Sequence, residues 1–98
     1  MGDTISGRIV EAPDGNLYRI SDDARVQNVE TFAGAGTKTP LHDGVAEGLS
    51  ARYGGAVGDW QKRKAVVYVD VGGEEVKAEV HWFQNGSDKH RFKIKRYL

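Results

Sequence analysis

Glu79 and His81 are the two residues whose types and spacing could support acid–base chemistry. They lie two positions apart within residues 76–83, where apolar and polar side chains alternate. Such alternation is typical of a half-buried strand, so both side chains are expected on its polar face. Their Cα atoms would be about 6.5–7 Å apart, a gap at which a carboxylate base and an imidazole acid could flank a phosphate. An ordinary solvated sheet face has the same pattern, and this alternative stays open.

A glycine pair, Gly72-Gly73, separates this segment from another strand-like run, residues 65–69. Two glycines between two such runs predict a hairpin whose turn has positive φ angles. The resulting register places apolar residues opposite apolar residues, because it pairs Val69 with Val76, Val67 with Ala78 and Ala65 with Val80. The turn chemistry and the hydrophobic pattern therefore agree.

Residues 90–96 predict a third strand, which Gln84-Asn85-Gly86 connects to the second. A three-residue loop with Gly86 in the left-handed region keeps Phe92 and Ile94 on the apolar face. The apolar pairs are then Ala78 with Phe92 and Val76 with Ile94. On the polar face this register pairs Glu79 with Arg91, His81 with Lys89, and Lys77 with Lys93. The predicted face is cationic, with one carboxylate and one imidazole at its centre.

The overall composition predicts one soluble globular domain that spans residues 1–98. The formal net charge is zero, but residues 1–59 hold 5 Lys/Arg and 9 Asp/Glu, whereas residues 60–98 hold 9 and 5. A basic C-terminal part fits a surface aimed at a polyanion, although a short chain can divide this way by chance. The chain has no cysteine, and its three histidines lack ligand spacing, so neither a metal nor another cofactor is expected. No run is apolar enough to span a bilayer and no secretory signal is evident, so a cytoplasmic location is expected.

The N-terminal part predicts a hairpin, a glycine loop and a helix. Pro13-Asp14-Gly15-Asn16 is strong turn chemistry between residues 5–11 and 17–21. Residues 22–32 are ambiguous, because Val26 and Val29 suit a helical turn whereas Val29 and Thr31 suit a strand, and an extended segment is favoured. Residues 33–39 lack a Walker pattern and are interpreted as a flexible loop, in which Lys38 could contact a phosphate. Thr39 and Pro40 predict the start of a helix whose apolar stripe, ending at Tyr53, would cover the sheet.

The predicted fold class is therefore α+β, with one main helix packed on an antiparallel sheet. The sheet would consist of a basic three-stranded meander in residues 60–98 and the N-terminal hairpin. Residues 1–59 would form the acidic part with the hairpin, the glycine loop and the helix. One helix face on one sheet face is a sound two-layer arrangement, and it leaves the cationic face uncovered.

Four segments, 32–36, 59–62, 78–82 and 92–95, resemble C-terminal domains of phage and polymorphic-toxin proteins. Those domains belong to the superfamily that includes barnase, EndoU, the tRNA-cleaving colicins and RelE, and the resemblance covers residues 17–98. It implies a metal-independent ribonuclease in which Glu79 is the base, His81 the acid, and Arg91 a phosphate contact. It also implies a toxin acting in the cytoplasm of a target cell, with an immunity or antitoxin protein as its partner. Some members of the superfamily lack the Glu/His pair.

The leading hypothesis is an endoribonuclease that cleaves RNA, with tRNA among the candidates, and leaves a 2′,3′-cyclic phosphate. Arg91 would stabilise the charge of the transition state. Further contacts to RNA are assigned to Lys38, Lys64, Tyr68, Lys77, Lys89 and Lys93, with Tyr68 able to stack a base. The alternatives are a non-catalytic module that binds RNA or an acidic protein, and a phage accessory or inhibitor protein that docks through a sheet edge.

Overall fold

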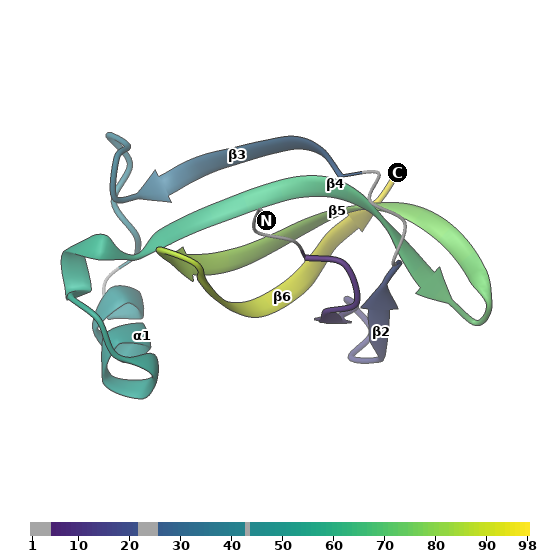
Figure 1. Ribbon diagram of the computed structural model, residues 1–98, viewed down its shortest axis with the longest axis horizontal. Coiled ribbons are helices and arrows are strands. Elements are labelled where there is room, and N and C mark those ends of the chain that lie inside the picture. Colours follow the sequence, from purple (N-terminus) through teal and green to yellow (C-terminus); the bar gives the residue numbers. More distant parts are fainter. Residues whose placement is uncertain (1–4, 22–25, 43) are drawn as a thin grey trace.

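The computed structural model describes residues 5–21, 26–42 and 44–98, and strands dominate this part of the chain (Figure 1). The strands are β1 (Ile9–Glu11), β2 (Leu17–Ile20), β3 (Gln27–Gly34), β4 (Gln61–Val71), β5 (Glu74–Asn85) and β6 (Asp88–Tyr97). The helices are α1 (Val45–Tyr53) and the short 3₁₀ turn η1 (Val57–Asp59). Residues 22–25 of the predicted extended segment, and residues 1–4, lie outside the described ranges.

The sheet closes on itself. The strand order is β2-β1-β6-β5-β4-β3, and β2 also pairs with β4. Two contacts between distant strands close the barrel, with Glu11 beside Lys93 in a parallel pair and Ile20 beside Val69 in an antiparallel pair. The five strands β1, β2, β4, β5 and β6 therefore form a barrel. Strand β3 lies outside it, because it pairs with the first half of β4.

The predicted α+β class, with a main helix packed on the sheet, is wrong. Of the described residues, 54% are in strands and 13% are helical, and the strands form a closed five-stranded barrel. Closure gives each strand a shared interior in which to bury its apolar side chains. No apolar sheet face is left over for the helix to cover.

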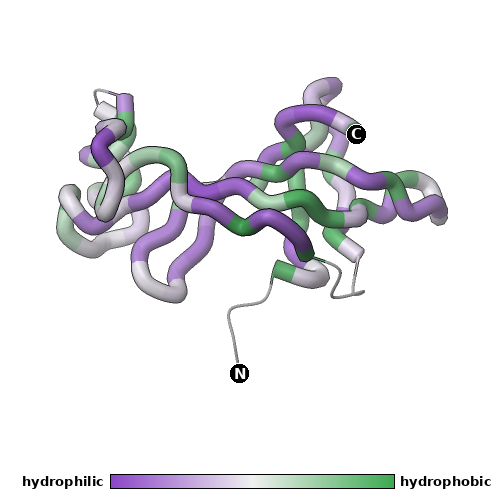
Figure 2. The backbone as a smooth tube through the Cα atoms, turned by 90° about the horizontal axis from the view of Figure 1, so that it is seen from above, coloured by the Kyte–Doolittle hydropathy of each residue, from purple (hydrophilic) through white to green (hydrophobic). Residues whose placement is uncertain are grey.

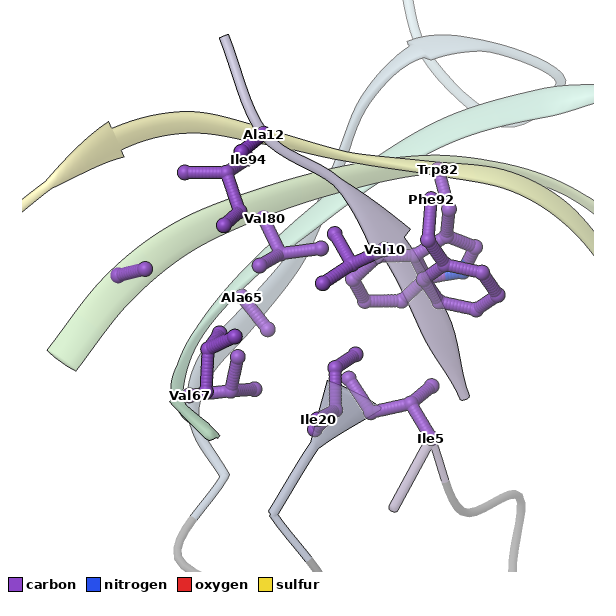
Figure 3. Close-up of a cluster of buried hydrophobic side chains, with 12 residues drawn as sticks. Ile5, Val10, Ala12, Ile20, Ala65, Val67, Val80, Trp82, Phe92 and Ile94 are labelled. Carbon is purple, nitrogen blue, oxygen red and sulfur yellow. The ribbon is translucent and has the colours of Figure 1, made fainter. Parts of the chain in front are cut away.

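The barrel interior holds the hydrophobic core (Figure 3). Trp82 and Phe92 stack with their ring centroids 5.3 Å apart. Val80, Val69 and Ala78 are each 0% exposed, which shows that the interior is filled by side chains. Along the strands, hydrophobic positions interrupt hydrophilic stretches (Figure 2), as expected when alternate side chains face the interior and the exterior.

The predicted N-terminal and glycine hairpins are confirmed. Strands β1 and β2 pair around the Pro13–Asn16 turn. In the β4–β5 hairpin the φ angles of Gly72 and Gly73 are 63° and 87°. The observed register contains all three predicted pairs, namely Val69 with Val76, Val67 with Ala78 and Ala65 with Val80. Local turn chemistry was enough to determine these pairs.

The predicted register between β5 and β6 is wrong. Asn85 pairs with Asp88, so the loop consists of Gly86 and Ser87, with Gly86 at φ 62° as expected. Such a short loop would turn the apolar residues of β6 outward, and a bulge at Arg91 (φ 61°) corrects this. A second register shift follows between Glu79 and Val80. The loop and the first bulge together pair Val80 with Ile94, whereas the predicted partner of Ile94 is Val76.

Helix α1 is shorter than predicted and lies at one end of the sheet (Figure 1). It begins after Gly44, whose φ is 80°, so Pro40 and Leu41 precede it. Leu49 is its buried residue. The indole of Trp60, which is 1% exposed, donates a 3.3 Å hydrogen bond to the carbonyl of Gly54 at the end of the helix. Trp60 is thus a buried residue that joins the end of the helix to the start of β4.

The side chain of Gln84 forms hydrogen bonds at the same end of the barrel. It is 3% exposed, and its Oε1 accepts hydrogen bonds from Trp82 Nε1 (2.9 Å) and from an Arg63 guanidinium nitrogen (3.3 Å). We expect Gln84→Leu to lower the free energy of unfolding by about 1–3 kcal/mol, because the buried indole N–H loses its acceptor. Urea unfolding measures this change. An unchanged unfolding energy would contradict it.

Candidate functional site

Glu79 and His81 are in direct contact on the outer face of the barrel. His81 Nε2 lies 2.7 Å from Glu79 Oε2. Their side chains share a face because Ala78, Val80 and Trp82 point into the interior between and beside them. The sequence therefore predicted the shared face. The direct contact differs from the expected gap, which a phosphate would have filled.

Arg96 is the arginine that contacts Glu79. Its Nε and a terminal guanidinium nitrogen lie 3.0 and 2.9 Å from Glu79 Oε1. Arg91, the predicted partner, is in the first bulge of β6, and Arg96 is the residue opposite Glu79. The shorter Gly86-Ser87 loop accounts for part of this exchange, and the two register shifts in β6 account for the rest. They carry no turn signal in the sequence, so the role of Arg96 was missed.

The Glu79–His81 pair is largely covered. The Glu79 side chain is 13% exposed and that of His81 is 16% exposed. Phe32 of β3 packs edge-on against His81, with ring centroids 5.0 Å apart. The pKa of Glu79 lies below its usual value, because the hydrogen bond from His81 and the charge of Arg96 outweigh the opposing effect of burial.

This lowered pKa predicts a loss of stability in acid. In the unfolded chain Glu79 titrates near its usual pKa of about 4.5, and in the folded protein it titrates lower. The contribution of the ionised group is therefore fully present above about pH 5 and is lost as the pH falls through the folded pKa. We expect the unfolding free energy of Glu79→Gln to fall less steeply than that of wild type between about pH 5 and pH 3. Equal slopes in urea unfolding would contradict this.

The first bulge of β6 lies beside a cationic cleft of about 340 Å³. Its lining includes four cationic residues and no carboxylate. The lining residues that bear on ligand binding are Lys62, Arg91, Lys93, Lys95, His81 and Phe83. Lys93 stands directly opposite His81, and Lys62 opposite Phe83. An excess of positive charge in a concave surface favours an anionic ligand.

Two phenylalanines are interleaved with these lysines. Lys62 Nζ lies 5.7 Å from the ring centroid of Phe32 and 5.5 Å from that of Phe83. Lys64 Nζ lies 5.5 Å from Phe32. Both rings are half-buried. We define the cationic face as Lys62, Lys64, Arg91, Lys93 and Lys95 together with Phe32, His81 and Phe83.

A neighbouring hollow of about 420 Å³ is less suited to an anion. It lies where the β3–β4 pairing is interrupted, beside Asn28 and Val29, and it is lined by the carboxylates of Glu30 and Glu79. Lys64 lines it as well, and its Nζ is 3.6 Å from Glu30 Oε1. Lys64 is therefore partly neutralised, and the cleft beside Arg91 carries more uncompensated positive charge.

The structure brings together only some of the predicted contact residues. Lys64 and Lys93 lie on the cationic face, whereas Tyr68 and Lys77 pair with each other farther along the β4–β5 hairpin. Lys38 is exposed in the loop after β3. The prediction that Lys89 lies on the polar face is wrong, because the residue is 6% exposed and stands opposite buried Gln84.

Three functional candidates were missed, namely Lys62, Phe32 and Phe83. Lys62 precedes Lys64 by two positions and so shares its face, a signal that was available in the sequence. Phe83 also follows the alternation of β5. Phe32 could not be placed, because the pairing of β3 with β4 contains two irregularities.

Within residues 5–21, 26–42 and 44–98, no group of three or more potential ligands is arranged to hold a metal ion. Among the helices described, none combines the length and apolar character needed to cross a membrane. No protein-family model matches the chain, and the searches of curated proteins and of solved structures gave no match.

Proposed function

We propose that this protein binds single-stranded RNA on the cationic face. The observation that carries the proposal is the cleft beside Arg91, which combines four cations with no carboxylate and adjoins two phenylalanine rings. Cations that follow a groove contact phosphates, and aromatic rings stack unpaired bases of any sequence. A base could take the place of Lys62 on either ring.

Titration of a fluorescently labelled RNA oligonucleotide tests this proposal through fluorescence anisotropy. Four phosphate contacts predict that log K falls with log salt concentration at a slope of about −2.8. A single strand is expected to bind more tightly than a duplex of the same sequence, because only unpaired bases can reach the rings. Absence of salt-dependent RNA binding would overturn the proposal. In that case, salt-dependent binding of an acidic polypeptide would identify a protein-binding module.

RNA cleavage is a second candidate, because His81 lies on the cationic face and is in contact with Glu79. Cleavage through a 2′,3′-cyclic phosphate needs one proton acceptor and one proton donor on either side of the phosphate. In the structure Glu79 and His81 are hydrogen-bonded to each other, and Phe32 packs against His81. They would have to separate before both could contact an RNA strand.

The same labelled RNA, incubated in EDTA, distinguishes cleavage from binding. Products with cyclic-phosphate ends from wild type, but not from Glu79→Gln or His81→Ala, would support cleavage by this pair. Intact RNA at saturating protein would leave binding as the function. A toxin role in a target cytoplasm, with an immunity or antitoxin partner, follows only if cleavage is found.

A further inference from the structure

Tyr53 is at the centre of a cluster of two aromatic and two arginine side chains, where helix α1 meets β6. The Tyr53 ring stacks on His90, with centroids 3.7 Å apart and an interplanar angle of 9°. Trp60 lies beside both rings, 6.1 Å from Tyr53 and 6.0 Å from His90. Three aromatic side chains therefore fix the end of the helix against the sheet and determine where its neighbours lie.

Two guanidinium groups converge on the Tyr53 ring. The Cζ atoms of Arg52 and Arg91 are each 5.6 Å from its centroid. Both arginines are exposed. Within the described ranges, neither arginine has a carboxylate within 4.0 Å. The carboxylate of Asp88 contacts His90 rather than either arginine. Its Oδ2 lies 3.3 Å from His90 Nε2, without hydrogen-bond geometry.

Arg91 belongs both to this cluster and to the cleft. It lines the cleft with Lys62 and Lys93, and it reaches Tyr53 from its position in the first bulge of β6. The bulge is therefore where the cationic face continues onto helix α1. An RNA strand that follows the cleft past Arg91 would next meet Arg52.

We propose that Arg52 and Arg91, held by the Tyr53 ring, form a clamp for one phosphate group of the bound RNA. This inference rests on the proposed function and extends it to helix α1. Two planar guanidiniums can donate paired hydrogen bonds to phosphate oxygens, which single lysines cannot do. Tyr53 is a positioning residue, because the contacts of both guanidiniums with its ring restrict where each fork can point.

The electrostatics of Tyr53 agree with this arrangement. Its pKa is lowered, chiefly by hydrogen bonding to Arg91 and then by Arg52, against an opposing effect of desolvation. The phenol thus senses both positive charges. An anion between the guanidiniums would offset those charges and raise the phenol pKa. Tyr53 can therefore report phosphate binding independently of RNA affinity.

Arg52→Ala tests the clamp, and Arg19→Ala is the matched control, since Arg19 is an exposed arginine on β2 whose guanidinium donates to the carbonyl of Gly7. We expect Arg52→Ala to make the salt slope of RNA binding shallower by about 0.7, the value for one phosphate contact on a single strand. We expect Arg19→Ala to leave the slope unchanged. If the Arg52→Ala variant binds RNA with wild-type affinity and an unaltered salt slope, the clamp is overturned and the proposed function still stands.

A second measurement keeps the clamp testable if RNA does not bind. In protein labelled with ¹³C at tyrosine Cζ, addition of inorganic phosphate is expected to shift the Tyr53 resonance of wild type. The shift should be absent in Arg52→Ala and present in Arg19→Ala. A phosphate-dependent shift without RNA binding would support the clamp as an anion site and overturn the proposed function. Failure of both measurements would overturn both.

Discussion

Replacing both Lys62 and Lys93 with alanine is expected to weaken binding of single-stranded RNA about 25-fold at 0.1 M salt. Each lost phosphate contact lowers the magnitude of the salt slope by about 0.7, so two contacts remove about 1.4. This electrostatic contribution to log K vanishes at 1 M salt. Between 1 M and 0.1 M salt, a slope smaller by 1.4 lowers log K by 1.4, which is about 25-fold weaker binding. Both lysines line the same cleft, one opposite Phe83 and the other opposite His81.

The slope itself distinguishes lost contacts from lost structure. Anisotropy titrations between about 50 and 200 mM salt measure it for wild type, for the double variant and for Arg19→Ala. Arg19 lies on β2, opposite Asp70 and away from the cationic face, so its removal controls for the loss of a positive charge elsewhere on the protein. A double variant with wild-type affinity and slope would show that RNA binds elsewhere. An Arg19→Ala variant as weak as the double variant would show that net charge alone governs binding.

Gly34→Ala is expected to lower the free energy of unfolding by about 2–5 kcal/mol. Gly34 ends β3, and its φ of 88° is in the left-handed region, where an alanine costs about 1–2 kcal/mol. A Cβ atom there would also lie 2.3 Å from the carbonyl oxygen of Trp60. Relief of that contact requires movement of backbone, which adds about 1–3 kcal/mol, the cost of overpacking.

Gly36→Ala is a matched control for this effect. Gly36 has almost the same φ angle, 82°, but the nearest atom to its added Cβ would be 3.9 Å away. Its expected loss is therefore the backbone strain alone, about 1–2 kcal/mol. Urea unfolding of both variants measures the difference. Equal losses would contradict the close approach of β3 to Trp60, on which the position of Phe32 depends.

Local turn signals predicted those parts of the fold that depend on neighbouring residues. The Gly72-Gly73 hairpin is the clearest case, because its turn residues and apolar pairs required the same register. The helix beginning at Thr39 was wrong because a capping signal has little weight when no apolar face is available. Closure of the barrel left no apolar sheet face for the helix. It depends on pairs such as Glu11 with Lys93, for which no local signal exists.

The candidate site was predictable only in part, for the same reason. Strand alternation placed Glu79, His81, Lys64 and Lys93 on one face. Alternation can detect neither the length of a loop nor the position of a bulge. The shorter loop turned Lys89 inward, and the loop and the two bulges of β6 together exchanged Arg91 for Arg96 beside Glu79. The bulge at Arg91 is also what directs that residue towards Tyr53 and helix α1. The features that sequence reasoning missed are therefore those on which the proposed RNA path depends.

The most direct test of the RNA-binding proposal is chemical-shift mapping of ¹⁵N-labelled protein with a single-stranded RNA oligonucleotide. The largest amide shifts are expected at Lys62, Lys64, His81, Phe83 and Lys93, extending through Arg91 to Arg52. The Gly72-Gly73 turn and the β1–β2 hairpin should change little. Shifts centred on the β1–β2 hairpin, or no shifts at saturating RNA, would contradict the cationic face as the RNA-binding surface.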